Sequence, residues 1–368
     1  MRGDAAWMDA ALALAARGLG RVWPNPAVGC VIVARGRVVG RGVTADGGRP
    51  HGETVALAQA GDEARGATAY VTLEPCAHHG RTPPCAEALI AAGIARVVIA
   101  QQDPDPRVDG GGIARLRAAG IAVTLGVREA AAAAQQAGFL SRIRRGRPMV
   151  TLKLAATLDG RIATASGESR WITGPVARAH VHAQRACHDA VLVGAGTVRA
   201  DDPRLDVRGM GTLPQPVRVV LSRRLSLPAG ARLFDGTGAP VWLLHGAAPA
   251  EAMRALEDRA TLLPCPTGAG GQIELETALR VLGDRGLTRV YCEGGGSLAA
   301  SLLAAGLVDR LDVYTAGAAI GAEGVPALGA MGLSALADAP RLRLRDVRAL
   351  GSDVLHRWQA GDQAAPAT

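Results

Sequence analysis

The sequence predicts an α/β protein built from two consecutive domains. In both halves of the 368-residue chain, short runs of Val, Ile and Leu alternate with segments of helical length, which is the pattern of layered α/β domains. The length suits two domains of ordinary size. Residues 141–148 hold four arginines, a Gly and a Pro that interrupt both apolar patterns. We therefore expect domains at 1–145 and 146–368, joined by a solvated linker; a basic patch for phosphate or nucleic acid is the alternative for this segment.

Composition and charge favour a soluble protein that acts on small molecules. Hydrophobic residues make up 48% of the chain and aromatic residues 3%, so the cores must be built from Ala, Val, Leu and Ile. The net charge of +8 suits anionic small substrates, and no basic stripe with interleaved aromatics indicates nucleic acid. Six scattered cysteines do not form a disulfide framework, and no apolar run reaches the roughly 20 residues that span a bilayer. We expect no signal peptide, no membrane or nucleic-acid partner, and a cytoplasmic homo-oligomer.

The first half contains the elements of one mixed or parallel sheet with helices. Helical spacing of apolar residues predicts a helix at 4–17, which Gly18 ends. Apolar β-branched runs predict strands at 28–34 and 37–42, joined by a turn. The same criteria predict further helices at 51–60, 85–93, 113–119 and 129–138, and strands at 69–73, 96–100 and 121–126.

A histidine, a glutamate and two cysteines in this half have the pattern of a zinc deaminase. The metal of such an enzyme needs three protein ligands and an open position for water. His51, Cys76 and Cys85 can supply the ligands, and both cysteines lie near predicted helix starts, where the helix dipole favours the thiolate that binds a metal. Glu53 is two residues from His51, so the two side chains point in different directions on a helix. We expect Glu53 to meet the water and to carry protons.

Two alternatives stand beside this interpretation. A structural zinc site would need a fourth ligand, which His78 or His79 could supply, although structural sites usually space their cysteines two to four apart. The second alternative is a cluster that binds no metal. His78 or His79 could instead contact an anionic substrate together with Arg81.

The second half predicts another α/β sheet that is not a repeat of the first. Apolar runs predict helices between strands, for example at 176–187 and 297–305, with the strands themselves at 149–156, 190–193, 217–221, 241–244, 289–292 and 311–315. The tail at 341–359 has the pattern of a hairpin that adds antiparallel strands at an edge.

Two glycine-rich loops in this half follow strands and lead into helices, at 193–197 and 293–297. Backbone N–H groups that glycines expose at a helix N-terminus form an anion site suited to a pyrophosphate. Each loop alone is weak evidence in a chain with 48 glycines, and neither has the Gly-x-Gly-x-x-Gly pattern. Ser222-Arg223-Arg224, also at a strand end, could bind a ribose 2′-phosphate and so favour NADPH over NADH; ordinary exposed arginines are the alternative.

Three motifs of the first half resemble the deaminase half of the bifunctional riboflavin-biosynthesis deaminase/reductase family. They are Pro24-Asn25-Pro26-Ala27-Val28-Gly29, His51-x-Glu53, and the run from Glu74 to Cys85 with its His-His-Gly-Arg-Thr-Pro-Pro loop. The resemblance implies a cytidine-deaminase-like three-layer α/β/α fold. It also implies zinc on His51, Cys76 and Cys85, Glu53 as the catalytic proton shuttle, and Asn25 as a substrate contact.

The chain departs from this family at two positions. The family usually has Ala where this chain has Gly52, which we expect to leave room at the metal and to cost only helix propensity. The family usually has His where this chain has Thr44, which alters the side chain available for a contact there.

Residues 153–160, 166–173, 194–203 and 293–297 are similar to the reductase half of the same family, which has a dihydrofolate-reductase-like α/β fold. The resemblance implies NADPH contacts at Ala155, Trp171, Thr197, Asp201, Ser222, Gly295, Gly296 and Ser297. It implies substrate contacts at Ser169, Arg185, Leu205, Arg208 and Glu293. Arg185 and Arg208 can bind a ribose phosphate through paired hydrogen bonds. Lys153 is either a proton donor or part of a structural ion pair.

We therefore expect one chain to carry out two consecutive steps. The first is zinc-dependent hydrolysis of the 2-amino group of a diaminopyrimidinone ribosylamino phosphate, and the second is NADPH-dependent reduction of its ribosyl group to ribityl. One alternative is a nucleoside or tRNA deaminase whose second domain binds RNA, which predicts salt-sensitive RNA binding and indifference to NADPH. Another is a zinc-stabilised binding module without activity, which metal chelation would unfold.

Overall fold

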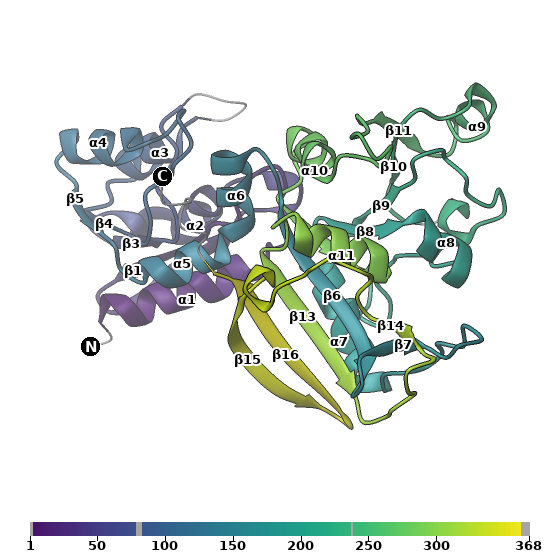
Figure 1. The fold of residues 1–368 in the computed structure, drawn as a ribbon. Coiled ribbons are helices and arrows are strands. Elements are labelled where there is room, and N and C mark those ends of the chain that lie inside the picture. The colour runs from purple at the N-terminus through teal and green to yellow at the C-terminus, as the bar shows by residue number, and fades with distance from the viewer. Residues whose placement is uncertain (1–2, 79–82, 237, 362–368) are drawn as a thin grey trace. The chain divides into compact units, whose positions relative to one another are not determined.

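The structure, a computed structural model, describes residues 3–78, 83–236 and 238–361. The chain divides into two compact units between Gly146 and Arg147. Both units are layered α/β structures, so the fold class predicted from the sequence is confirmed (Figure 1). Among the described residues, no helix is both long enough and apolar enough to cross a membrane.

The first unit is built on a five-stranded sheet with the order β2-β1-β3-β4-β5. β1 is antiparallel to both of its neighbours, whereas β3, β4 and β5 run parallel to one another. The sheet is therefore mixed. Because β3 and β4 are parallel, the loops that follow them begin at the same edge of the sheet. The strands are β1 (Gly29–Ala34), β2 (Arg37–Val43), β3 (Thr68–Val71), β4 (Arg96–Ile99) and β5 (Ala122–Leu125).

Helices cover both faces of this sheet because the side chains of β1 alternate between two cores. Val31 and Val33 pack with α1 (Asp4–Ala16) and α5 (Glu129–Gln135). Cys30 and Ile32 pack in the second core, whose helices are α2 (Gly52–Ala60), α3 (Cys85–Ala91), α4 (Gly111–Ala118) and α6 (Ala137–Arg145). Cys30 is fully buried and packs as a small core residue. The unit thus has three layers, α/β/α.

The second unit is built on a nine-stranded sheet with the order β11-β10-β9-β8-β12-β6-β13-β16-β15. Its strands run parallel from β11 to β13, and the tail then adds the antiparallel hairpin β16–β15 at the edge, as the sequence predicts. A small second sheet pairs β7 with β14, and the sequence did not indicate these two strands or β11. The strands are β6 (Met149–Thr157), β7 (Arg161–Ala163), β8 (Ala190–Gly194), β9 (Val217–Leu221), β10 (Val241–His245), β11 (Thr261–Pro264), β12 (Arg289–Cys292), β13 (Arg310–Ala316), β14 (Val325–Pro326), β15 (Leu342–Leu350) and β16 (Asp353–Ala360).

The helices of this unit are α7 (Pro175–Ala186), α8 (Ala195–Asp201), α9 (Ala250–Arg254), α10 (Leu275–Asp284) and α11 (Gly296–Ala304). α7 and α11 cover opposite faces of the sheet (Figure 1). Because α8 and α11 each follow a strand of one parallel run, their N-termini lie at the carboxyl edge of the sheet, where ligands usually bind in such folds.

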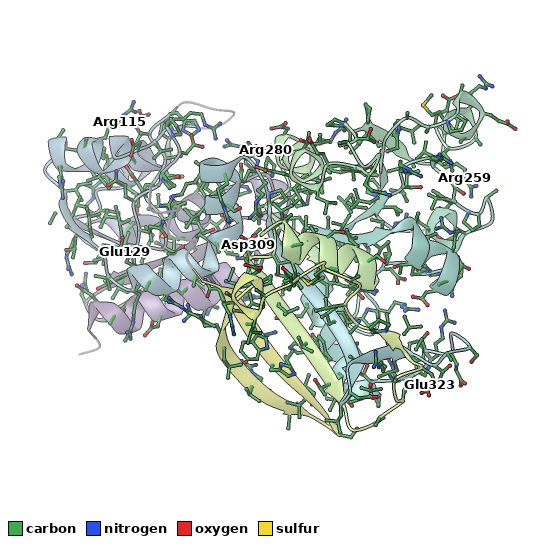
Figure 2. The ribbon with its side chains drawn as sticks, in the orientation of Figure 1. Arg115, Glu129, Arg259, Arg280, Asp309 and Glu323 are labelled. Atoms are coloured by element: carbon green, nitrogen blue, oxygen red, sulfur yellow. The ribbon has the colours of Figure 1, made fainter. Side chains whose placement is uncertain are left out.

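The segment at 141–148 is not a solvated linker. α6 continues through Arg145, because Phe139 and Leu140 bury one side of it, and Gly146 ends it with a φ of 67°. Arg147 is only 6% exposed and donates two hydrogen bonds to Asp309, at 2.8 and 3.1 Å. Asp309 lies just before β13, where Figure 2 labels it. The expectation fails because a distant carboxylate pairs with one of the four arginines.

The packing of α1 on β1 yields a stability prediction at Gly29. A Cβ at this position would lie 2.0 Å from the backbone oxygen of Ala11 and 2.9 Å from the backbone nitrogen of Ala15. We predict that Gly29→Ala lowers the free energy of unfolding by about 1–3 kcal/mol, as overpacking does, measured by urea denaturation. The control is Gly3→Ala, because a Cβ at Gly3 has no neighbour within 4 Å. An unchanged denaturation midpoint for Gly29→Ala would contradict the close packing.

Candidate active sites

Three segments of the first unit bring His51, Cys76 and Cys85 together. His51 directly precedes α2, Cys76 lies in the loop after β3, and Cys85 begins α3. The Nδ1 of His51 is 3.7 Å from Sγ of Cys76 and 3.3 Å from Sγ of Cys85. Zinc bound tetrahedrally at about 2.0 Å from nitrogen and about 2.3 Å from sulfur would set separations of about 3.6 Å. The spacing of these three side chains therefore fits a zinc ion.

One of the two cysteines of this cluster favours the thiolate, and the other keeps its proton. The pKa of Cys76 is lowered to about 4, because the Cys85 thiol, the His51 ring and the Cys85 backbone N–H all donate hydrogen bonds to its sulfur. The pKa of Cys85 is raised, because its proton is held by Cys76 and because it is buried. A thiolate stabilised in this way is the form that binds a metal.

Glu53 lies in the first turn of α2 and is 3% exposed. Its Oε2 is buried and has no hydrogen-bond partner among the described residues. Burial raises the pKa of Glu53 to about 7, because the charged form is poorly solvated there. Three ligands beside an unpartnered buried carboxyl are the composition of a catalytic metal site, not of a closed structural one. Of the two histidines considered as a fourth ligand, His78 does not join the cluster, and His79 lies with Arg81 outside the described residues.

The two positions that depart from the family lie beside the site. A Cβ at Gly52 would be 2.6 Å from the backbone oxygen of Val28, so the expectation that Gly52 leaves room at the metal is wrong. The strand carbonyl fills that space. The buried hydroxyl of Thr44 accepts from the Val28 N–H at 3.0 Å and donates to the Pro26 oxygen at 3.1 Å. Asn25 donates to the Gly48 oxygen at 2.6 Å. Thr44 therefore fixes the turn that carries Asn25.

Asp103 is a residue of this region that the sequence interpretation missed. It follows β4 in the run Asp103-Pro-Asp105-Pro, and its burial raises its pKa to about 7. The loop that contains it meets the metal-site loop, because the Asp103 backbone N–H donates to Oε2 of Glu74 at 3.2 Å. Two prolines around acidic residues at the end of a parallel strand were the signal that could have indicated it.

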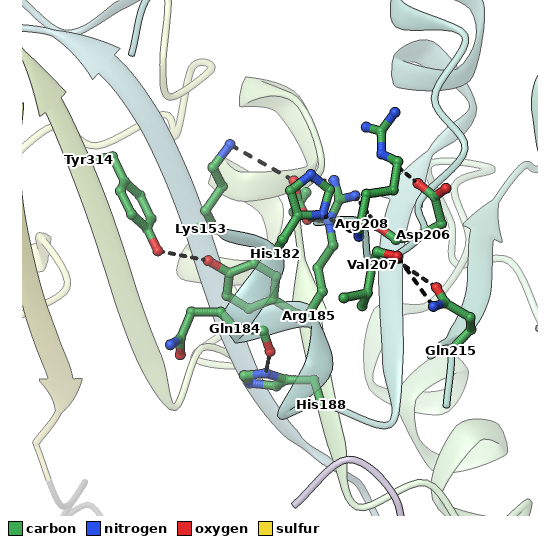
Figure 3. Close-up of polar contacts among 12 residues, drawn as sticks. Lys153, His182, Gln184, Arg185, His188, Asp206, Val207, Arg208, Gln215 and Tyr314 are labelled. Carbon is green, nitrogen blue, oxygen red and sulfur yellow. Dashed lines mark hydrogen bonds and ion pairs between the residues drawn. The ribbon is translucent and has the colours of Figure 1, made fainter. Parts of the chain in front are cut away.

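In the second unit, Lys153, Arg185 and Glu293 form an ion cluster (Figure 3). Arg185 donates from Nε and Nη2 to the two carboxylate oxygens of Glu293, at 2.5 and 3.0 Å, and from Nη1 to the backbone oxygen of Asp206 at 2.7 Å. The Nζ of Lys153 is 3.9 Å from Glu293. Burial lowers the pKa of Lys153. Burial would raise the pKa of Glu293, but the charges of Arg185 and Lys153 outweigh this effect and keep the pKa of that carboxyl low. Two cations thus face one carboxylate.

Arg208 and His182 extend this cluster, and the sequence interpretation did not include His182. The Arg208 backbone N–H donates to Nδ1 of His182 at 3.3 Å, and the Arg208 Nε is 3.2 Å from Asp206. Burial and the two arginines lower the pKa of His182, which favours the neutral ring. Leu205, also an expected substrate contact, is 2% exposed and packs in the hydrophobic core.

The two glycine-rich loops lie next to each other. β8 and β12 are parallel neighbours, and a Cβ at Gly295 would be 3.7 Å from Oγ1 of Thr197. Gly295 and Ser297 are exposed, whereas Gly296 is contacted by the chain at 326–329. The backbone N–H groups that were predicted to bind an anion at each loop therefore belong to neighbouring loops.

The structure also describes the other positions that were expected to contact NADPH or the substrate. Trp171 is 70% exposed, and the Arg178 guanidinium lies 4.6 Å from its ring centre. Ser222 is buried, and its neighbour Arg223 donates to the Gly271 oxygen. Three more positions are described: Ala155 packs near Tyr314, Ser169 is half-buried, and Asp201 ends α8.

Comparisons with known proteins cover both units. Residues 1–101 match the cytidine and deoxycytidylate deaminase zinc-binding region, and residues 148–356 match the RibD C-terminal domain. The riboflavin biosynthesis protein RibD of Escherichia coli K12 is 44% identical over 363 residues, which cover 95% of this chain and 98% of that protein. RibD of Aquifex aeolicus is 40% identical over 352 residues, covering 96% and 97%.

Solved structures are similar along the whole length. RibD of Acinetobacter baumannii, form 1, is 40% identical with a TM-score of 0.88 and covers 98% of this chain and 99% of its own. The Thermotoga maritima diaminohydroxyphosphoribosylaminopyrimidine deaminase/5-amino-6-(5-phosphoribosylamino)uracil reductase is 35% identical with a TM-score of 0.84, covering 97% and 99%. The likeness therefore includes both units in one chain.

The ligand cluster predicts the metal content of the protein. Cys76→Ala removes one of three ligands and should lower bound zinc from about one ion per chain to a small fraction of that, measured by elemental analysis after dialysis. Cys187→Ala, at a cysteine outside the cluster, is the matched control and should keep its zinc. Full zinc occupancy in Cys76→Ala would mean that the metal is held elsewhere.

Proposed function

The chain belongs to the RibD family of riboflavin biosynthesis proteins, and on that premise we propose where and how its two units act. It is a bifunctional enzyme, a deaminase and a reductase. The substrate we assign is 2,5-diamino-6-ribosylamino-4(3H)-pyrimidinone 5′-phosphate, in keeping with the activity named for the T. maritima relative. The product after both steps is 5-amino-6-ribitylaminouracil 5′-phosphate. The alternative of an RNA-binding second unit is not favoured, since residues 148–356 match the RibD reductase domain.

In the first unit, His51, Cys76 and Cys85 would hold zinc, which when bound lowers the pKa of a water molecule and so supplies the nucleophile. Water adds to the ring carbon that bears the amino group, and ammonia leaves. Glu53 takes a proton from the water and gives one to the departing amine. The observation that carries this assignment is the buried, unpartnered Oε2 of Glu53, because a carboxyl with a pKa of about 7 can both accept and return a proton at neutral pH.

In the second unit, the residues around Lys153 and Glu293 would bind the deaminated product. When bound, NADPH would supply a hydride for the first carbon of the ribosyl group, a reduction that also takes up one proton. The adjoining loops with Thr197 and Gly295 would hold the cofactor phosphates, and Arg208 would meet the substrate phosphate. Lys153 is our candidate for the proton donor, because burial lowers its pKa and so eases release of the proton. The protein's main task is to align the carbon with the nicotinamide.

The division of labour is tested with Glu53→Gln. Ammonia release from the diaminopyrimidinone should fall by about 10²–10⁴-fold, because no group remains to carry the proton, while NADPH oxidation with the deaminated intermediate should stay at the wild-type rate. Zinc content is measured in parallel. The control is Glu63→Gln, an exposed glutamate of the same unit. If both activities fall while the fold and the zinc are intact, the assignment of one step to each unit is wrong.

A second copy of the chain is the partner that we assign to the terminal hairpin. Leu344, Val347 and Val354 are 51%, 56% and 41% exposed, and their strand register places them on one face of β15 and β16. The face continues into a cavity of about 510 Å³ that His356 and Leu328 help to line. An apolar strip of this kind is usually covered, and another copy is always present at the same concentration.

The cytoplasmic location expected from the sequence stays a prediction.

Sedimentation checks the assembly. The wild-type chain should sediment above the mass of one chain, and Val347→Glu should shift it toward a single chain by placing a charge on the strip. The control is Val38→Glu, which places the same charge at a valine of the first unit that is 41% exposed. This variant should leave the sedimenting mass unchanged. A wild-type protein of single-chain mass would refute the assembly.

A further inference from the structure

Glu74 has an unusual environment for an acidic side chain. It is 3% exposed and lies two residues before the ligand Cys76. Its Oε1 accepts hydrogen bonds from the backbone N–H groups of Gly112 and Ile113, at 2.9 and 3.1 Å. Its Oε2 accepts from those of Asp103 and Gly110, at 3.2 and 3.1 Å. Within the described ranges no Lys, Arg or His forms an ion pair with it, so backbone dipoles alone solvate this carboxylate.

These four bonds join two stretches of chain that meet at the metal site. One is the peptide at 74–78, and the other is the loop from 101 into the start of α4. The Glu74 backbone N–H also donates to the backbone oxygen of Gln101 at 2.9 Å. A Cβ at Gly112 would lie 1.9 Å from the Pro75 oxygen, so the two backbones touch where the carboxylate binds. The approach requires glycine at this position of α4.

Cys76 is the ligand that most needs such support. His51 directly precedes α2 and Cys85 begins α3, so helices fix both. Cys76 lies in an irregular loop, where its backbone oxygen accepts from the Ala86 N–H at 3.2 Å. A ligand in a loop must be ordered before it can bind at a set distance, and metal sites depend on groups outside the ligands to do this.

We propose that Glu74 is a positioning residue of the metal centre, whose carboxylate holds the Glu74-Pro75-Cys76 peptide on the start of α4 and thereby keeps the Cys76 sulfur at its distance from His51. The proposal rests on the zinc site of the proposed function. It gives Glu74 no contact with substrate or metal. Its oxygens are directed to the backbone of residues 103–113 and are absent from the ligand cluster.

Two substitutions of different severity test the role in the full-length, zinc-loaded protein. Glu74→Gln replaces one oxygen with an NH₂ group that faces two N–H donors and so loses two of the four bonds. Glu74→Asp keeps the carboxylate but shortens the side chain by one methylene. Glu63→Gln, at an exposed glutamate of the same unit, is the matched control.

The primary readout is the rate at which zinc passes to a chromogenic chelator, and the second is the visible absorption of the cobalt-substituted protein, which reports the thiolate geometry. We expect zinc release to be 10–100-fold faster in Glu74→Gln, the usual effect of losing a group that supports a ligand, with Glu74→Asp between it and the wild type. The cobalt spectrum should change in both variants. The reductase rate, measured on the same chains, should stay unchanged.

A wild-type release rate and cobalt spectrum in folded Glu74→Gln would overturn the proposal, even if its unfolding midpoint falls, because the carboxylate would then only stabilise the fold. If Glu74→Gln does not fold, Glu74→Asp decides by the same measurements. Failure of the proposed function is recognised separately: the wild-type protein would bind zinc and respond to Glu74 substitution but release no ammonia from the diaminopyrimidinone.

Discussion

The close approach of α2 to the β1–β2 hairpin is the constraint on which the first active site depends. A Cβ at Gly40 would lie 2.2 Å from the Ala56 oxygen, and one at Gly42 would lie 2.1 Å from the Gly52 oxygen. The helix therefore rests on strand backbone with no side chain between them. His51 directly precedes this helix and Glu53 lies in its first turn. The distance of the helix from the sheet therefore sets the positions of one metal ligand and of the proton carrier together. The scarcity of aromatic residues fits the same architecture, because small residues permit such contacts.

The two active sites solve the problem of buried charge differently. In the first, Glu53 has an oxygen without a partner, and burial, with a smaller contribution from the charge of Cys76, raises its pKa. In the second, Glu293 is paired with Arg185 and faces Lys153, which keeps its pKa low. The first carboxyl is thus suited to moving a proton, and the second to holding an array of cations in place for an anionic ligand.

Local patterns in the sequence were sufficient for much of this structure. The alternation of apolar runs predicted the layered units and the terminal hairpin, and the spacing of His51, Cys76 and Cys85 predicted the ligand cluster. The failures concern contacts between distant residues. The burial of Arg147 depends on Asp309, 162 positions later, and the space at Gly52 depends on a strand carbonyl. His182 was missed because it is ordinary in its own stretch, and only the fold brings it to a site.

The burial of Arg147 affects how readily a protease can cut the chain between its two units. The stretch from 142 to 147 holds four arginines, the residue after which trypsin-like proteases cut, at the junction of two folded units. Such a junction is normally where proteolysis separates domains. Here three of the arginines belong to α6 and the fourth is ion-paired in the second unit, so an extended backbone is not presented to a protease. Because one chain carries both units, translation produces the deaminase and the reductase in a one-to-one ratio. A junction that resists cleavage keeps the two units joined and so keeps that ratio.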